Sequence, residues 1–517
     1  MDTLARAGYA DLFRQDPSHP HWAYDYAERL VRRHGPDRQV VIQTSMSPSG
    51  RFHVGNFRDT ACAYLVHRAL LRRGRDSVIL LSFDDYDPIR PSQAAEQPDL
   101  AGYGARPLGA ATGRSTRICR RYIAELKRMG ICPADADADG RTAPESLWQT
   151  HYQHERYLAG SYRSLQRRYL RASGKLARLL GVRRPENLFS VYCEQCGRGT
   201  TRNLKLGRKR VRYACESCGA VTTTDRVEPV KPSWALDWTL RVTHEGICCE
   251  PAGQDHCSAG STMDRTRAIY HGFLRAPQPV IVPYGLVRQF GDLGKVSGSR
   301  GGGMTLSDLM AVMSPQMILW LYGRPNCLSD FRISLERSAF LGYYDEYDRF
   351  LARVAAGDRR ATALYELIRG ERGEGDRPPA APPPRMRAVL GLLHGNCYDA
   401  ARVTAILGPA AAARVARGRA WLAAHGRCWI DQVREAEPEA GTLLAGGRLP
   451  ERWSRVSYRR LYLTLFGTED GPPLRRLEEI FGTAELVAAI RAYLDHAERP
   501  LRERVLALLR PGDRDAG

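Results

Sequence analysis

Apolar residues in the first part of the chain form short unbroken runs instead of strict alternation. "QVVIQTS" at 39–45 and "DSVILLSFDD" at 76–85 are rich in aliphatic residues, which predicts strands buried on both faces. The sequence between them predicts a helix from about Asn56 to Arg73. Two buried strands joined by a helix make a βαβ unit, so this pattern predicts a parallel sheet covered by helices.

The remaining pattern is more helical. A helix is expected over 112–130, and a long helical stretch from about Pro144 to Leu180. Strand-like sequence returns at 278–287. From about Arg332 the pattern is mostly helical, with a Pro-rich linker, "EGDRPPAAPPPR", at 374–385.

Length and charge limit the possible functions. A chain of 517 residues is too long for one hydrophobic core, so two to four domains are expected. Lys and Arg total 77 against 57 acids, a net charge of +20, which favours RNA, DNA or nucleotides as partners. Arginines on solvated faces are the alternative reading. The sequence contains neither a signal-peptide core nor a bilayer-spanning apolar run, so we expect a soluble, cytoplasmic protein without membrane contact.

Two Cys-x-x-Cys pairs, separated by 18 residues, lie in a segment of altered composition at 187–225. The four residues are Cys193, Cys196, Cys215 and Cys218. Gly197 and Gly219 follow the pairs and permit the tight backbone of a knuckle. Two such knuckles complete a tetrahedron of thiolates, which predicts a closed, structural Zn²⁺ site in a reducing compartment. Four unrelated buried thiols would not explain the double spacing.

Three Gly-containing segments combine small residues with polar groups at predicted strand ends. In "SPSGRFHVGN" at 47–56, His53 and Asn56 are suited to donate to phosphate oxygens at a helix N-terminus. Alternatively, His53 is a packing residue at the start of the helix. The segment lacks both the Walker and the Gly-x-Gly-x-x-Gly spacing.

The other two segments lie later in the chain. Asp255 and His256, in "GQDHCSAGS", are suited to ribose hydroxyls and polar substrate groups. "GKVSGSRGGG" at 294–303 carries Lys295 and Arg300 and is suited to close over a triphosphate, with a flexible basic linker as the alternative.

The residues from His53 to Asn56 resemble the HIGH-type signature of class I aminoacyl-tRNA synthetases, and Lys295 to Ser299 resembles the partner KMSKS loop. Asn at the last signature position is similar to the class I lysyl-tRNA synthetases of archaea and some bacteria. The similarity continues in "DDYDPIR" at 84–90, "SWALDWTLR" at 233–241, "EPAGQDHCSAGS" at 250–261 and "DEYDR" at 345–349.

This resemblance implies an α/β fold with a Rossmann-like, parallel-sheet nucleotide-binding domain over 1–335, carrying the zinc-binding insertion at 187–225. An all-α domain that binds the tRNA anticodon would follow over 336–517. There, "RWSRVSYRRLYLTLF" at 452–466 interleaves Arg with aromatics, which suits stacking on unpaired bases and equally an ordinary amphipathic helix.

The resemblance also implies a reaction. Lysine and ATP form lysyl-adenylate with Mg²⁺, and the lysyl group passes to tRNA-Lys. Zn²⁺ would be structural, and a monomer is favoured. The catalytic residues implied are His53, Asn56, Lys295, Ser297 and Ser299. ATP would contact Pro48, Ser49, Gly55, Asp255 and Lys295, with Gly55 making room for adenine. The amino acid would contact Ser47, Asp59, Trp238, His256 and Tyr284, with Asp59 receiving the lysine ammonium.

Several positions depart from the family pattern. Asp59 stands where Glu is usual, Gln254 where Lys is expected, and Gly285 where Glu is common. Val296 and Arg300 replace Met and Lys in the loop. A paralogue that uses another amino acid or a biosynthetic acceptor is therefore an alternative. A zinc-containing RNA-binding protein without catalysis and a nucleotidyltransferase with the HIGH-type fold are further alternatives.

Overall fold

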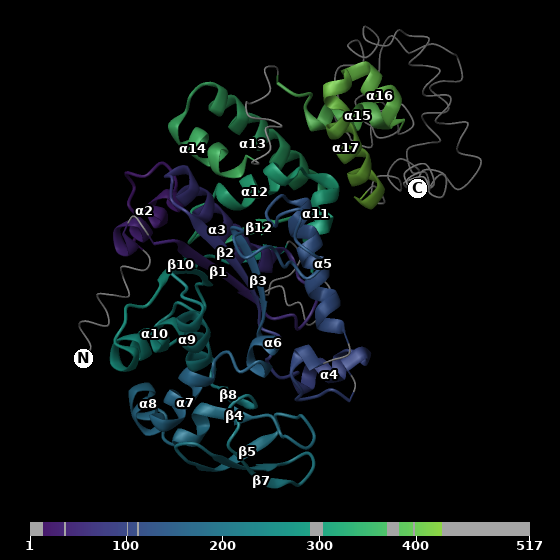
Figure 1. Ribbon diagram of the computed structural model, residues 1–517. Helices are drawn as coiled ribbons and strands as arrows, with labels where there is room; N and C mark the ends of the chain where they lie inside the picture. Colours follow the sequence, from purple (N-terminus) through teal and green to yellow (C-terminus); the bar gives the residue numbers. More distant parts are fainter. Residues whose placement is uncertain are drawn as a thin grey trace, which may run out of the picture. The chain divides into compact units, whose positions relative to one another are not determined.

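The protein is described by a computed structural model (Figure 1). The described residues are 14–35, 38–100, 102–110, 113–289, 303–369, 382–395 and 399–425. They form two compact units. The first holds the described residues up to Ser307, together with Pro315–Ile333 and those following Arg359 up to residue 369. The second holds Asp308–Ser314, Ser334–Asp358 and the described residues between 382 and 425.

A five-stranded parallel sheet forms the centre of the first unit, in the order β10-β9-β1-β2-β3. Its strands are β1 (Val40–Met46), β2 (Ser77–Phe83), β3 (Trp148–Tyr152), β9 (Cys249–Gly253) and β10 (Val280–Tyr284). All seven residues of β2 are buried, as its unbroken apolar run predicts. The predicted parallel α/β architecture is confirmed.

Helices cover both faces of this sheet. On one face, α3 (Val54–Arg72) joins β1 to β2, and Thr44 of β1 points toward it. On the other face, Val41 packs with the apolar residues of α9 (Trp234–His244) and α10 (Thr262–Ile269). The strand order reverses between β1 and β9. In open α/β sheets, ligands bind beyond the carboxyl ends of the strands at this kind of reversal.

The prediction of one continuous helical stretch between Pro144 and Leu180 is wrong. Residues 148–152 form the edge strand β3, because Trp148, Thr150 and Tyr152 alternate with more exposed residues and fill the sheet face. Three short helices follow it: α6 (Gln153–Leu158), α7 (Arg163–Arg171) and α8 (Ser173–Leu180). Strand β9 was not predicted either, since Cys-Glu-Pro-Ala-Gly combines an acid, a Pro and a Gly that strands disfavour.

The cysteine-containing segment forms small antiparallel sheets. β4 (Phe189–Val191) pairs with β8 (Val230–Pro232). Between them, β5 (Thr201–Leu206), β6 (Val211–Cys215) and β7 (Val221–Thr224) form a three-stranded sheet.

The rest of the first unit includes α2 (Trp22–His34), α4 (Pro91–Glu96), α5 (Arg114–Arg128), α12 (Pro315–Gly323), α14 (Arg359–Ile368) and the strand pair β11 (Val287–Gln289) and β12 (Phe331–Ile333). α11 spans Leu306–Val312. Short 3-10 turns and one π-helical turn, Tyr270–Leu274, complete the connections.

The second unit is helical throughout its described residues, as predicted. It contains α13 (Arg337–Ala355), α15 (Met386–Gly395), α16 (Ala400–Leu407) and α17 (Ala412–His425). Phe340 stacks on Trp421 with ring centroids 4.9 Å apart, and Arg414 binds both carboxylate oxygens of Asp348. The segment 452–466 lies outside the described residues. No described helix combines the length and apolarity needed to cross a membrane.

Candidate functional site

The turn after β1 ends in a helix cap built by the two predicted phosphate-binding residues. His53 Nδ1 accepts a hydrogen bond of 3.0 Å from the Gly55 N–H, and Asn56 Oδ1 accepts one of 3.1 Å from the His53 N–H. Neutral His53 therefore carries its proton on Nε2, and the Asn56 amide keeps its nitrogen as a donor. With these two hydrogen bonds, the His53 ring and the Asn56 amide place N–H donors at the N-terminus of α3. Such donors favour the binding of an anion there.

The position of the His53 ring leaves no room for a side chain at Gly55. A Cβ at Gly55 would lie 2.8 Å from His53 Cε1 and 2.9 Å from its Nδ1, closer than such atoms approach in proteins. His53 therefore caps the start of α3, as the alternative interpretation proposed. This structural role is compatible with a role in ligand binding, because the cap fixes the orientation of the ring that would contact a phosphate.

Residues on both sides of the predicted KMSKS-like loop lie beside this helix start. Val54 N–H donates to Met304 O at 2.8 Å, and Val287 O lies 3.9 Å from where a Gly55 Cβ would be. Lys295, Ser297 and Ser299 themselves lie outside the described residues. The described residues that flank this segment, Val287 and Met304, therefore lie next to the cap formed by His53 and Asn56.

Asp59 of α3 is buried and is held by two hydroxyl groups. Thr44 of β1 donates to Oδ1 at 2.6 Å, and Tyr284 at the end of β10 donates to Oδ2 at 3.1 Å. Burial raises the pKa of Asp59 to about 8, and the neighbouring Glu250 adds to the rise, while the two hydroxyls oppose it. No Lys, Arg or His pairs with Asp59 among the residues that the structure describes.

A second buried acid, Glu250 of β9, was missed in the sequence. Its Oε1 accepts from Ser45 Oγ at 3.1 Å. The buried side chains of Trp238 and Gln43 also face this carboxylate, and both lower its pKa. Burial raises the pKa of Glu250 to about 7, although the Arg241 cation opposes this. No sequence signal marked Glu250, because the strand that holds it was not predicted.

The other predicted ligand contacts lie at neighbouring strand ends or in the core. A Cβ at Gly253 would lie 2.5 Å from Asp255 Oδ1 and 3.7 Å from Tyr284 Cε2, so Asp255 and Tyr284 face each other across the ends of β9 and β10. His256 is exposed in the turn after β9, while Trp238 is buried in α9. Ser47, Pro48 and Ser49 lie in the turn between β1 and α3.

Asp84, Asp85 and Asp87, the aspartates in the family-like segment after β2, are further candidates for the lysine ammonium, but all three already bind protein groups. Asp84 pairs with the buried Arg241, and Asp87 pairs with Lys231 at 2.9 Å. Asp85 accepts a backbone hydrogen bond of 2.7 Å from His154. Asp84 and Asp87 belong to an ion network in which Arg241 and Lys231 also meet Asp237 of α9, whereas Asp85 is bound by the backbone of α6.

Close packing against a neighbouring segment explains the glycine at position 285. A Cβ there would lie 2.3 Å from the backbone carbon of Ser329 and 2.6 Å from Asp330 N. The Asp330 carboxylate also accepts hydrogen bonds of 2.7 Å from both Leu286 N–H and Gln254 Nε2. Two of the departures from the family pattern, Gly285 and Gln254, are therefore linked through one neighbouring segment.

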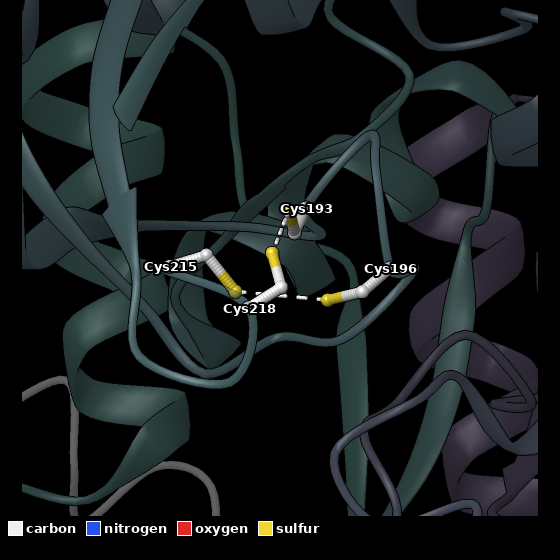
Figure 2. A group of neighbouring side chains, drawn as sticks. All are labelled: Cys193, Cys196, Cys215 and Cys218. Atoms are coloured by element: carbon white, nitrogen blue, oxygen red, sulfur yellow. Dashed lines mark hydrogen bonds between the residues drawn. The ribbon is translucent and has the colours of Figure 1, made fainter. Parts of the chain in front are cut away.

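The four paired cysteines converge in the inserted segment (Figure 2). All four Sγ atoms lie within 4.8 Å of one another. Cys193 and Cys218 are 3.7 Å apart at sulfur, and Cys196 and Cys215 are 3.6 Å apart. Gly197 and Gly219 adopt φ of +72° and +73°, the left-handed conformation that each knuckle needs.

This donor set fits a zinc ion. A tetrahedron with Zn–S bonds of about 2.3 Å has sulfur–sulfur edges of about 3.8 Å, close to the separations of the two pairs. Burial raises the pKa of the Cys215 thiol, but hydrogen bonds from the backbone N–H groups of Cys218 and Ser217 outweigh it and lower the pKa. Burial raises the pKa of the neighbouring Cys196 thiol, so a bound cation would be needed to hold all four sulfurs as thiolates.

Comparisons with known proteins place this chain in a family. The family model for "tRNA synthetases class I (K)" matches residues 20–110 and 145–371. A lysine–tRNA ligase from Pyrococcus horikoshii is 30% identical over 386 residues, which is 72% of this chain and 72% of that protein. A lysine–tRNA ligase from Borrelia garinii subsp. bavariensis is 30% identical over 348 residues, covering 64% and 63% respectively.

The matched region therefore spans between 63% and 72% of the length of these two relatives. Among solved structures, a glutamate tRNA ligase from Elizabethkingia meningosepticum aligns with 89% of this chain and 99% of its own. This alignment has a TM-score of 0.37 and 12% sequence identity.

Proposed function

The chain belongs to the class I (K) tRNA synthetases, and from that premise we propose that it activates L-lysine with ATP and transfers the lysyl group to tRNA-Lys. The relatives that support this proposal are named lysine–tRNA ligases. In the first step the lysine carboxylate attacks the α-phosphorus of ATP, the bond to the bridging oxygen breaks, and pyrophosphate leaves. In the second step a ribose hydroxyl of the tRNA end takes the lysyl group and AMP leaves.

The observation that carries the choice of amino acid is the state of Asp59. A buried carboxylate that receives two hydrogen bonds and has no cation partner among the described residues is a costly arrangement without a ligand. An alkylammonium ion would complete it, because it brings both a positive charge and N–H donors. Binding of lysine would then favour the ionised form of Asp59, and the ion pair would offset the free energy lost when the carboxylate is buried.

Glu250 supports the same proposal. Asp59 is one methylene shorter than the Glu usual in the family, and a second acid in reach of the pocket offsets that loss. The Glu250 carboxylate is buried, and its charge raises the pKa of Asp59. Two acids near one pocket favour a substrate with two ammonium groups, the α-amino and ε-amino groups of lysine.

The helix cap supplies the phosphate chemistry in this proposal. The N–H groups of His53 Nε2, Asn56 and the first turn of α3 would hold the triphosphate and the charge that develops as pyrophosphate leaves. Lys295, Ser297 and Ser299 would close over the pyrophosphate, and Mg²⁺ would accompany the phosphates. Pro48, Ser49, Gly55 and Asp255 would border the nucleotide, with Asp255 toward the ribose.

The amino-acid side of the pocket would be completed by Ser47, Trp238, His256 and Tyr284. Zn²⁺ on the four cysteines would hold the insert together without taking part in catalysis, since all four ligand positions are filled by protein. The helical region after residue 335 would bind the tRNA anticodon. Cytoplasmic location follows from this role in translation.

The test is lysine-dependent ATP–pyrophosphate exchange, measured with all twenty amino acids. We expect exchange with lysine alone, and its loss in Asp59→Asn. Gln254→Lys serves as a control at the pocket edge, since it restores the residue usual in the family. Exchange with a different amino acid, and none with lysine, would contradict the lysine assignment and favour the paralogue. Absence of exchange with every amino acid would favour a non-catalytic protein.

A further inference from the structure

Lys231 is a buried cation on β8, the strand that pairs with β4 and closes the cysteine-containing segment. Its ammonium group lies 3.1 Å from Asp237 Oδ2 and 2.9 Å from Asp87 Oδ1. Asp237 belongs to the first turn of α9, whereas Asp87 follows β2 of the central sheet. One side chain therefore joins the end of the insert to two elements around the central sheet.

Two stacked tyrosine rings lie next to this ammonium group. Tyr86 and Tyr157 stack with ring centroids 4.2 Å apart, and Lys231 Nζ lies 5.8 Å from the first centroid and 5.5 Å from the second. The Tyr157 hydroxyl also donates to Asp237. Burial lowers the pKa of Lys231, but the two neighbouring carboxylates outweigh this effect and raise the pKa above its ordinary value, so the side chain stays charged.

Asp237 is the point at which this ion network reaches the proposed amino-acid pocket. Its Oδ2 atom binds Lys231 and also lies 3.4 Å from Nε of Arg241, one turn further along α9. The next residue on the helix is Trp238, whose buried side chain faces the Glu250 carboxylate. Lys231 therefore restrains the turn of α9 that carries a predicted contact of the substrate lysine.

Loss of the Lys231 charge would leave this network short of cations. Two cations, Lys231 and Arg241, face three carboxylates there among the residues that the structure describes. The carboxylates are those of Asp84, Asp87 and Asp237. A single guanidinium group for three buried or partly buried acids is costly. Asp237 would then take up a proton or move toward water, and either change would shift the turn that carries Trp238.

We propose that Lys231 is a positioning residue for lysine activation, which holds Trp238 against Glu250 from the end of the inserted segment. The inference rests on the proposed function, because it concerns the amino-acid side of that pocket. Lys231 lies outside every segment that carries the family resemblance. In this arrangement the four cysteines fold the insert, and Lys231 links that fold to α9.

The test compares Lys231→Met with Arg163→Met in the full-length, zinc-loaded protein. Arg163 pairs with Glu228 near β8, but no ion pair joins either of these residues to Asp237 in the described part of the chain. We expect Lys231→Met to raise the KM for lysine in ATP–pyrophosphate exchange about tenfold, with the KM for ATP and the zinc content unchanged. Arg163→Met should match the wild type in all three measurements. Lys231→Arg, which keeps the charge, should recover most of the lysine affinity.

A direct readout of Trp238 separates positioning from a loss of stability. Fluorotryptophan labelling gives each indole a fluorine NMR resonance, and Trp238→Phe identifies the resonance of Trp238. This resonance should shift in Lys231→Met and stay in place in Arg163→Met. The double variant Lys231→Met with Asp237→Asn removes both charges of the pair, so it provides the same comparison if the single variant does not fold.

Three results would overturn the proposal. An unchanged KM for lysine in a folded Lys231→Met variant would show that Lys231 does not act on the pocket, and so would an unshifted Trp238 resonance. Equal rises in the KM for lysine in Lys231→Met and Arg163→Met would show that both residues act only through the stability of the insert. If the wild type shows no lysine-dependent exchange, the proposed function fails, whereas the Trp238 resonance still tests whether Lys231 positions this side chain.

Discussion

Asp59 and Tyr284 are 225 positions apart in the chain, yet the Tyr284 hydroxyl donates to Asp59 Oδ2 at 3.1 Å. The bond joins α3, which follows the first strand, to the end of the outermost strand β10. Thr44 occupies the other carboxylate oxygen. The two donors together fix the orientation of an acid whose pKa burial raises to about 8.

Tyr284→Phe should weaken lysine binding without affecting ATP. The hydroxyl stabilises the ionised form of Asp59, so its removal raises the pKa of Asp59 further. We expect the KM for lysine in exchange to rise roughly tenfold, the usual scale for a hydrogen bond to a charged group. The pH at which activity reaches half its maximum should rise as well.

Tyr169→Phe is the matched control for this change. Tyr169 is also buried, and its hydroxyl bonds Thr239 at 2.9 Å, but it packs against the insert and not the site. It should lower thermal stability to a similar extent and leave the KM for lysine unchanged. Equal kinetic effects in the two variants would argue that Tyr284 acts only through stability.

Asp59 also makes stability depend on pH in a particular direction. Its pKa in the native state is about 8, against an ordinary value of 3.8, so the native protein retains a proton that the unfolded chain has released. The contribution of Asp59 to stability is therefore present below about pH 4 and is lost as pH rises toward 8. Without lysine, Asp59→Asn should reduce the fall in stability over this range.

Denaturant unfolding at pH 5 and pH 8 provides the measurement. Glu250, with a pKa raised to about 7, contributes in the same direction, so part of the fall should remain in the Asp59→Asn variant. Saturating lysine should stabilise the wild type more at pH 8 than at pH 5. A wild type and an Asp59→Asn variant with identical pH dependence would contradict the raised pKa.

The sequence predicted the strands with continuous apolar runs and the signatures with fixed local spacing. The family resemblance placed Asp59 and Tyr284 at the same ligand, but the hydrogen bond between them was not predicted, because it depends on strand order, which no local pattern encodes. Strand β3 was hidden because Trp148 to Tyr152 directly precedes three helices without a turn signal. Glu250 was not predicted as a site residue because its strand, β9, lacks the β-branched residues that would have predicted a strand there.

Gly55→Ala should displace the His53 ring from the helix cap. A Cβ would lie 2.8 Å from the ring, so either the ring or the first turn of α3 must shift. We expect the kcat of lysine activation to fall at least about tenfold, because misplacement of a charge-stabilising donor is costly in the transition state. Single-turnover formation of the adenylate measures this step.

Gly174→Ala provides the control for the glycine substitution. Gly174 lies in α8, with no atom within 4 Å of its Cβ position, so alanine should preserve or slightly raise stability there. Activity equal to the wild type is expected. An active Gly55→Ala enzyme with an unchanged kcat would show that the His53 orientation is unimportant for the reaction.

Removal of the metal should unfold the insert before the rest of the protein. The four thiols repel one another as thiolates, and only a bound cation compensates for their convergence. We expect one zinc per chain by elemental analysis and a fall in Tm of roughly 5 °C or more in Cys193→Ser. Cys132→Ser, at a buried thiol outside the cluster, should retain the metal. Full zinc content in Cys193→Ser, or unchanged melting after chelation, would contradict a structural zinc site.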